Sequence, residues 1–213
     1  MNIRKIILSL FILISFAYAE ESNWAVGPHL LISIPQSDFA NLSKTGEGIG
    51  GKILYKIESV ATFVKPRFDI AYISYGEKRK TTPFSVGYFI VQTRNESFQF
   101  TIGPEFHYKI GRVTPYIAPM GGLYLYRTVV SIPDLYYYYG IPASETVDKL
   151  TKLGWNINAG LLIDIGLGPH IDISVKYQTI RGAVKSEVEG HKIESDAKDI
   201  NISIGVLFYL NED

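Results

Sequence analysis

Apolar and polar residues alternate one by one along much of the chain. In residues 170–179 every second position is apolar, and the positions between are polar or charged. Successive side chains of a β-strand point to opposite faces, whereas a helix cannot separate residues with this period. The same alternation is present in residues 98–110, 155–165 and 200–210. These segments predict four strands, each with one apolar face and one polar face.

Three earlier segments show a similar pattern, at residues 24–34, 49–57 and 64–72. A further strand is expected within residues 114–130, which brings the number to eight. Which of its residues face outward is ambiguous, because one set of apolar residues falls on even-numbered positions and the next set on odd-numbered positions. The first set is Tyr116, Ala118 and Met120, and the second is Leu123 and Leu125. A β-bulge at Gly121-Gly122 would place both sets on one face.

The connections between the eight expected strands alternate between short and long. The short ones are tight turns near 57–60, 111–113 and 166–169. The long and polar ones are Pro35–Thr45, Gly76–Ser97, Pro133–Leu150 and Gly182–Ser195. The pattern leaves open whether residues 84–92 form an extra extracellular hairpin. With eight strands, all short turns fall at the end that holds both termini. This asymmetry is typical of a transmembrane β-barrel with periplasmic turns and extracellular loops.

The chemistry of the two faces favours a barrel in lipid over a soluble one. The apolar face is almost free of charge, and its aromatic residues fall near the strand ends, as in the two interfacial belts of membrane barrels. The polar face is expected to fill the interior as a plug of paired charges. The plug candidates are Lys52, Lys56, Lys65, Arg67, Asp69, Glu105, His107, Lys109, Asp164, His170, Asp172 and Lys176.

Composition narrows the classes of protein further. The chain has 21 Lys plus Arg against 21 Asp plus Glu, so it lacks the positive charge of a general nucleic-acid binder. It contains no Cys, which excludes disulfides, thiolate zinc sites and iron–sulfur clusters. At 46% apolar residues it is too hydrophobic to be disordered.

The first 19 residues have the pattern of a cleaved export signal. Arg4 and Lys5 precede an apolar run over 6–16, and Ala17-Tyr18-Ala19 matches a signal peptidase site. The run is shorter than the ~20 residues that a spanning helix needs. We therefore expect residues 1–19 to be removed and residues 20–213 to form one outer-membrane β-barrel domain, in the cell outer membrane of a Gram-negative-type bacterium.

The chain resembles the small eight-stranded outer-membrane β-barrel family, the OmpA/OmpX-like proteins and their stand-alone outer-membrane β-barrel domain relatives. The resemblance is carried by the order and spacing of Pro35-Gln36-Ser37-Asp38-Phe39, Thr45-Gly46-Glu47-Gly48, Gly103-Pro104, Pro115-Tyr116 and Gly121-Gly122. It implies an all-β fold, an eight-stranded antiparallel up-and-down transmembrane barrel.

Catalytic chemistry has little support in the sequence. His170, Asp172 and Ser174 share one face of a strand, but this face points into the expected plug and away from a lipid substrate. The 4 His residues give no metal-ligand pair at useful spacing. We therefore predict no enzymatic activity, no catalytic or metal-ligating residues, and no cofactor.

The long loops are the remaining place for function. Tyr136, Tyr137, Tyr138 and Tyr139 form either an aromatic extension of the outer belt or a ligand-contacting patch. Residues 37–44 are expected to form a short helix at the rim, with Asp38 as its cap.

The sequence thus predicts an integral outer-membrane protein with a structural or surface-interaction role through long extracellular loops. The alternatives are a narrow porin-like channel and a soluble periplasmic ligand-binding barrel. The expected partners are outer-membrane lipid, the barrel-insertion machinery during biogenesis and an unidentified loop-bound surface ligand, with no nucleic acid. The barrel is expected to be a monomer.

Overall fold

The computed structural model describes residues 23–56, 63–84, 87–131, 144–166, 168–188 and 191–210. These residues form antiparallel β-sheet with one short helix, α2 (Ser37–Leu42). The strands are β1 (Trp24–Gln36), β2 (Gly46–Tyr55), β3 (Val64–Tyr75), β4 (Lys78–Phe84), β5 (Gly87–His107), β6 (Val113–Ser131), β7 (Ser144–Asp164), β8 (His170–Val188) and β9 (His191–Leu210). The expected export signal lies outside the described residues. No described helix has the length and apolar character needed to cross a membrane.

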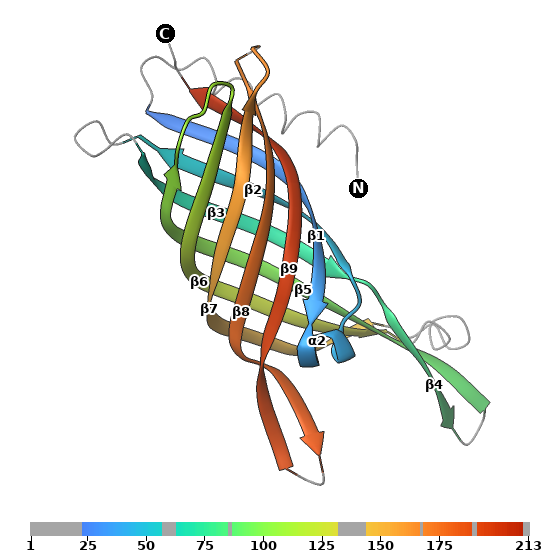
Figure 1. Ribbon diagram of the computed structural model, residues 1–213. Helices are drawn as coiled ribbons and strands as arrows, with labels where there is room; N and C mark the ends of the chain where they lie inside the picture. The colour runs from blue at the N-terminus through green and yellow to red at the C-terminus, as the bar shows by residue number, and fades with distance from the viewer. Residues whose placement is uncertain are drawn as a thin grey trace.

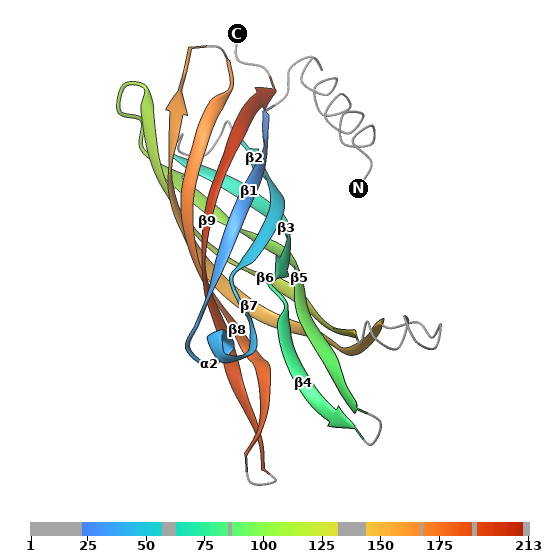
Figure 2. The ribbon, with the colours of Figure 1, turned by 90° about the vertical axis from the view of Figure 1, so that its right-hand side faces the viewer.

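Eight of the strands close into a barrel, which confirms the predicted fold. Neighbours in sequence pair with one another around the ring, β1 pairs with β9, and β3 pairs with β5. The β4 strand lies beside β5 beyond this ring and forms a hairpin with it. β1 begins and β9 ends at the same end of the barrel, the turn end, and the β4–β5 and β8–β9 hairpins extend past the opposite end, the loop end (Figures 1 and 2).

The outer wall of the barrel is apolar. Leu30, Ile102 and Leu153 are more than 60% exposed, and Val175 is 49% exposed. The alternate residues of the same strands, such as Lys176, are buried inside. A soluble barrel would place its apolar side chains inward and its charged ones in water. The observed facing is the one expected for a wall in contact with lipid.

Aromatic side chains on the outer wall meet in pairs. The ring centroids of Trp24 and Tyr55 lie 4.6 Å apart, and those of Tyr72 and Phe98 lie 4.7 Å apart. Interfacial aromatic belts of this kind flank the lipid band of membrane barrels. Tyr116, whose facing the sequence pattern left ambiguous, is only 5% exposed and points inward.

The short connections lie at the turn end as predicted, where they are described. Ile110 and Val113 exchange backbone hydrogen bonds of 2.7 and 3.0 Å around a two-residue turn. Gly111 in this turn has a φ of 60°, in the left-handed region that suits glycine. The predicted turn at 57–60 lies outside the described residues.

Two of the expected polar loops are largely β-structure, and the hairpin that the sequence left open at 84–92 is present. Most of the segment Gly76–Ser97 forms the β4–β5 hairpin, and much of Gly182–Ser195 extends β8 and β9. Beyond the lipid band neither face of a hairpin has to be apolar, so the alternation disappears while backbone pairing continues.

The facing of β6 also differs from the expectation. Tyr116, Ala118 and Met120 point inward, whereas Leu123 and Leu125 point outward. The pairing of β5 with β6 keeps one register on both sides of Gly121-Gly122, so the proposed bulge there is wrong. The ambiguity arose because this strand places apolar residues on the inner face too, where they pack among the charged groups.

Candidate functional site

The centre of the barrel interior, the lumen, contains a compact network of ion pairs. Lys52 Nζ lies 2.8 Å from Asp172 Oδ2 and 3.8 Å from Glu105 Oε2. Arg67 donates to Glu105 through Nη1 at 2.9 Å, and to Asp69 through Nε at 2.7 Å and Nη2 at 2.8 Å. All five side chains are at least 93% buried. We call these five residues the central ion-pair cluster.

Four different strands supply this cluster. Lys52 on β2 faces Asp69 on β3 in the strand register, and Glu105 follows on β5. Asp172 comes from β8, on a distant part of the ring. The Tyr116 hydroxyl of β6 donates to Asp172 Oδ1 at 2.8 Å, and Lys52 Nζ lies 4.5 Å from the centroid of the same ring. The cluster therefore ties β8 to β2, β3 and β5, none of which pairs with it.

A second polar group lies around Asp199 on β9. The Asp199 carboxylate accepts hydrogen bonds from the Tyr75 hydroxyl at 2.9 Å, Gln178 Nε2 at 2.8 Å and Asn201 Nδ2 at 3.0 Å. Nearby in the lumen, Lys176 Nζ donates to Gln99 Oε1 at 2.9 Å. Buried polar groups are stable only when they are hydrogen-bonded, and these two arrangements satisfy several at once.

Apolar clusters lie on both sides of these polar layers. Toward the loop end, α2 directs Phe39 against Tyr75 and Tyr126, with ring centroids at 5.1 and 5.8 Å. Phe39 is 4% exposed. Toward the turn end, a second cluster includes Leu54, Leu162 and Leu207. The rim helix predicted at 37–44 thus exists and carries Phe39 into the mouth of the barrel, although Asp38 lies within the helix and does not cap it.

These layers fill the cross-section of the lumen. An eight-stranded barrel is just wide enough for its own side chains, and here charged, polar and aromatic groups exclude water from one another. Burying charges is favourable only when each has a close partner of opposite sign. In the central ion-pair cluster two cations contact three carboxylates, and these ion pairs hold opposite walls of the barrel together.

The structure separates the plug candidates into three groups. Six lie buried in the lumen, namely Lys52, Arg67, Asp69, Glu105, Asp172 and Lys176. Four lie half-buried at the turn end of the lumen, namely Lys65, His107, Asp164 and His170. Lys56 and Lys109 are exposed, which corrects their assignment to the plug. Both follow the regular part of their strands, where side chains reach water. Tyr136, Tyr137, Tyr138 and Tyr139 lie outside the described residues.

Sequence reasoning missed several inward residues. Asp199, Gln178 and Tyr75 form the second polar group, and Phe39 closes the loop end. The alternation of β9 could have identified Asp199, because it shares a face with Asn201. The participation of Tyr75 could not be found in this way, since it depends on contact across the lumen.

The described residues do not assemble a catalytic relay from His170, Asp172 and Ser174. The Ser174 hydroxyl lies 2.7 Å from that of Ser203, and the Asp172 carboxylate is held by Lys52 and Tyr116. His170 packs against the ring of Tyr209 instead, with centroids 5.0 Å apart. Within the part of the chain that the structure describes, no group of three or more His, Cys, Asp or Glu side chains could hold a metal ion.

The closed eight-stranded ring, the apolar outer wall and the charged interior define the class of protein: this is the fold of the small bacterial outer-membrane β-barrels. The Neisserial surface protein A is similar in structure, with a TM-score of 0.53 and 16% identity over 88% of this chain and 97% of that one.

Two further solved structures are similar at lower scores. The attachment invasion locus protein Ail of Yersinia pestis has a TM-score of 0.48 and 16% identity, covering 88% of this chain and 99% of that one. The outer-membrane enzyme PagL has a TM-score of 0.44 and 10% identity, covering 87% and 99%. No family model and no curated protein sequence matches the chain. These likenesses concern the fold, and fold does not determine function.

Proposed function

We propose that the protein is a non-enzymatic outer-membrane barrel that acts as a surface-interaction protein through its loop end, with the lumen closed to bulk permeation. The observation that carries the proposal is the division of the molecule's surface. The outer wall suits lipid, and the lumen is filled by its own side chains. The hairpins beyond the loop end are then the large polar surface left for a partner.

The hairpins have the construction expected of a presented surface. β4 pairs with β5 along seven positions beyond the ring, from Lys78↔Thr93 to Phe84↔Gly87. This paired backbone projects past the ring of strands (Figure 2). At its base, Arg94 and Arg127 flank the buried carboxylate of Glu96, and Arg94 Nη2 lies 2.7 Å from Glu96 Oε1. The name of the structurally similar Neisserial surface protein A is consistent with such a role.

The proposed partners follow from the same surfaces. The apolar wall suits the lipid of an outer membrane, and insertion of such a barrel requires an assembly machinery. The ring closes without a second chain, so we propose that the protein is a monomer. The long connections would face the cell exterior and the short turns the periplasm.

Shortening the extensions should weaken surface interaction without unfolding the barrel. One variant replaces residues 78–91 by Asn-Gly, a sequence that favours a tight hairpin turn, and a second variant similarly shortens 133–143. We expect both to keep the mobility difference between unheated and heated samples on denaturing gels, because loop length changes closure entropy only slowly. Adhesion of cells that display each variant to cultured animal cells should fall below that of the full chain. Full adhesion by a variant that lacks both extensions would contradict the proposal.

A filled lumen predicts the absence of a steady, wide conductance. Refolded full-length protein in planar bilayers should show no stable currents of the size of a diffusion pore, because Lys52, Arg67 and Glu105 block the centre of the barrel. Replacing all three by alanine should raise the frequency of current events, provided that the variant still shows heat-dependent mobility. Stable wide-pore currents from the unmodified protein would favour the narrow porin-like alternative.

A further inference from the structure

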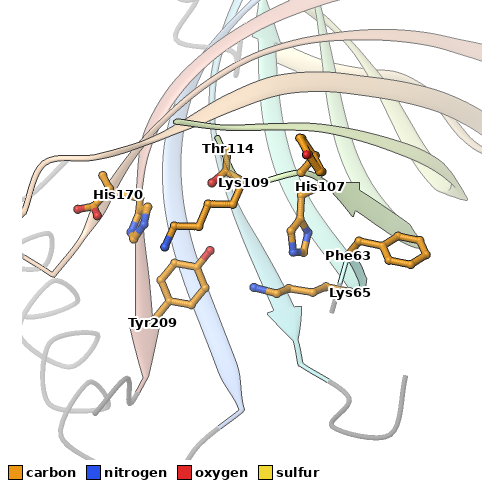
Figure 3. A pocket seen from close by; sticks show the side chains of 9 residues that line it. Phe63, Lys65, His107, Lys109, Thr114, His170 and Tyr209 are labelled. Atoms are coloured by element: carbon orange, nitrogen blue, oxygen red, sulfur yellow. The ribbon is translucent and has the colours of Figure 1, made fainter. Parts of the chain in front are cut away.

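The turn end of the lumen opens into a cavity that the plug does not fill. It has a volume of about 440 Å³ and is bordered by side chains of β3, β5, β6, β7, β8 and β9, and by Phe63, Tyr108 and Lys109 just outside the strands (Figure 3). We call this cavity the vestibule. Its lining includes the polar side chains of Lys65, His107, Lys109, Asp164, His170 and Tyr209. Its volume lies in the range of small-molecule pockets, about 300–1,000 Å³.

Backbone pairing fixes the vestibule wall. The His107 N–H donates to the Phe63 carbonyl at 2.9 Å, and the Asp164 N–H donates to the Arg112 carbonyl at 2.8 Å. These contacts extend the ladders to the last residues of the barrel. Lys65, His107, Asp164, His170 and Tyr209 therefore come from ordered strand ends, which are a better base for a binding site than a loop, and Lys109 lies two residues beyond the end of β5.

The charges in the vestibule are mainly positive. Figure 3 shows the Lys65 and Lys109 side chains extended toward Tyr209, with His107 and His170 beside them. Lys65 Nζ lies 4.7 Å from the centroid of the Tyr209 ring. The one carboxylate among the lining residues is Asp164, whose Oδ1 already accepts the Gly166 N–H at 2.7 Å. Two ammonium groups thus share the vestibule with one carboxylate.

The vestibule ends blindly inside the barrel. Leu54, Leu162 and Leu207 belong to the apolar cluster against which Tyr209 packs, and the central ion-pair cluster follows beyond it. A ligand that enters from the turn end therefore cannot continue through the lumen. Such a site retains a ligand, whereas a channel would pass it on.

We propose that the vestibule binds a small phosphate monoester or diester, that is, a molecule with an oxyanion attached to an apolar or ring-shaped group. Lys65 and Lys109 would bind the oxyanion through charge-assisted hydrogen bonds, which are the stronger kind. Tyr209 and Phe63 offer ring surface for the rest of the ligand. The phosphate group could belong to a free solute or to a lipid headgroup. The proposal goes beyond the role of the loops and holds whichever side of the membrane the turn end faces.

The test is calorimetric titration of the full chain, refolded in phosphatidylcholine bicelles, with phenyl phosphate and with inorganic phosphate. We expect saturable binding of phenyl phosphate, weaker binding of inorganic phosphate, and loss of about tenfold or more in affinity in Lys65→Gln/Lys109→Gln. The matched control is Lys44→Gln/Lys149→Gln, which removes two exposed lysines at the loop end and should bind as the unmodified protein does. Lys109→Gln alone serves if the double variant does not fold, because Lys109 is exposed and lies outside the regular strands.

Replacing part of the phosphatidylcholine by phosphatidylglycerol distinguishes the two sources of phosphate. Competition with phenyl phosphate that requires Lys65 and Lys109 supports a lipid headgroup, and its absence supports a free solute. No saturable binding, or equal losses in the vestibule and control variants, would overturn the proposal. Neither result bears on the loop-end function, which is tested by adhesion.

Discussion

Replacing Arg67 with methionine is expected to lower the free energy of unfolding by about 3–5 kcal/mol, the range for breaking a buried ion pair from one side. Arg67 is the partner of both Asp69 and Glu105, at 2.7 and 2.9 Å, and all three side chains are at least 94% buried. Without the guanidinium, two carboxylates remain in a site closed to water. Lys52 can offset only part of this loss, because it lies 3.8 Å from Glu105 and already binds Asp172.

The loss should be measured by denaturant unfolding of the refolded protein in lipid vesicles. Trp24 and Trp155 lie on the outer wall and report the transition by fluorescence. Arg79→Met is the matched control, since Arg79 pairs with Glu77 at 3.7 Å in an exposed place, where such pairs contribute about 0–1 kcal/mol.

A second variant separates charge burial from side-chain packing. Arg67→Met/Asp69→Asn/Glu105→Gln keeps the shapes of the two acidic side chains but removes their uncompensated charges, and it should recover at least half of the lost stability. If Arg67→Met were no more destabilising than Arg79→Met, the lumen would be hydrated and the description of a closed plug would be wrong.

The barrel could be predicted from the sequence because a strand in contact with lipid needs an apolar residue at every second position. Every second position of β8 from Ile171 to Tyr177 had to be apolar, and the pattern could be read directly. The rule does not apply to the β4–β5 hairpin, where both faces can be in water, nor to β6, where Tyr116 and Met120 pack inside. Prediction failed in these places because the physical constraint that creates the signal is absent.

Which inward charges contact each other could not be predicted from the sequence, because these contacts depend on how the strands are arranged around the lumen. The strand pattern placed Lys52 and Asp172 on inward faces, but their contact crosses the lumen between β2 and β8. Strand number and register together decide which side chains meet at one depth. The vestibule was missed for the same reason: Lys65 and His170 obey the same alternation as Arg67 and Asp172, yet they lie beyond the apolar cluster that ends the plug.

Placing an arginine at Val175 should impair assembly most among substitutions on the outer wall. Val175 is 49% exposed, and Ala159 and Ile202 lie beside it on the neighbouring strands. A charge at the mid-depth of the lipid face costs about 2–4 kcal/mol. We expect Val175→Arg to lower both the yield of heat-modifiable protein and the free energy of unfolding in vesicles. Val175→Leu, which keeps the apolar character, should leave both close to those of the unmodified protein.

The depth and the facing of the substitution can each be controlled. Thr151→Arg adds the same charge on the outer wall near the loop end, next to the exposed Lys149, and should cost only about 0–1 kcal/mol. Lys176→Val changes the adjacent inward residue and removes its 2.9 Å hydrogen bond to Gln99. It should disturb insertion less than Val175→Arg, because water or a neighbouring donor can serve the freed amide during assembly. Normal assembly of Val175→Arg together with failure of Lys176→Val would show that the wall facing lipid has been assigned to the wrong side of the strand.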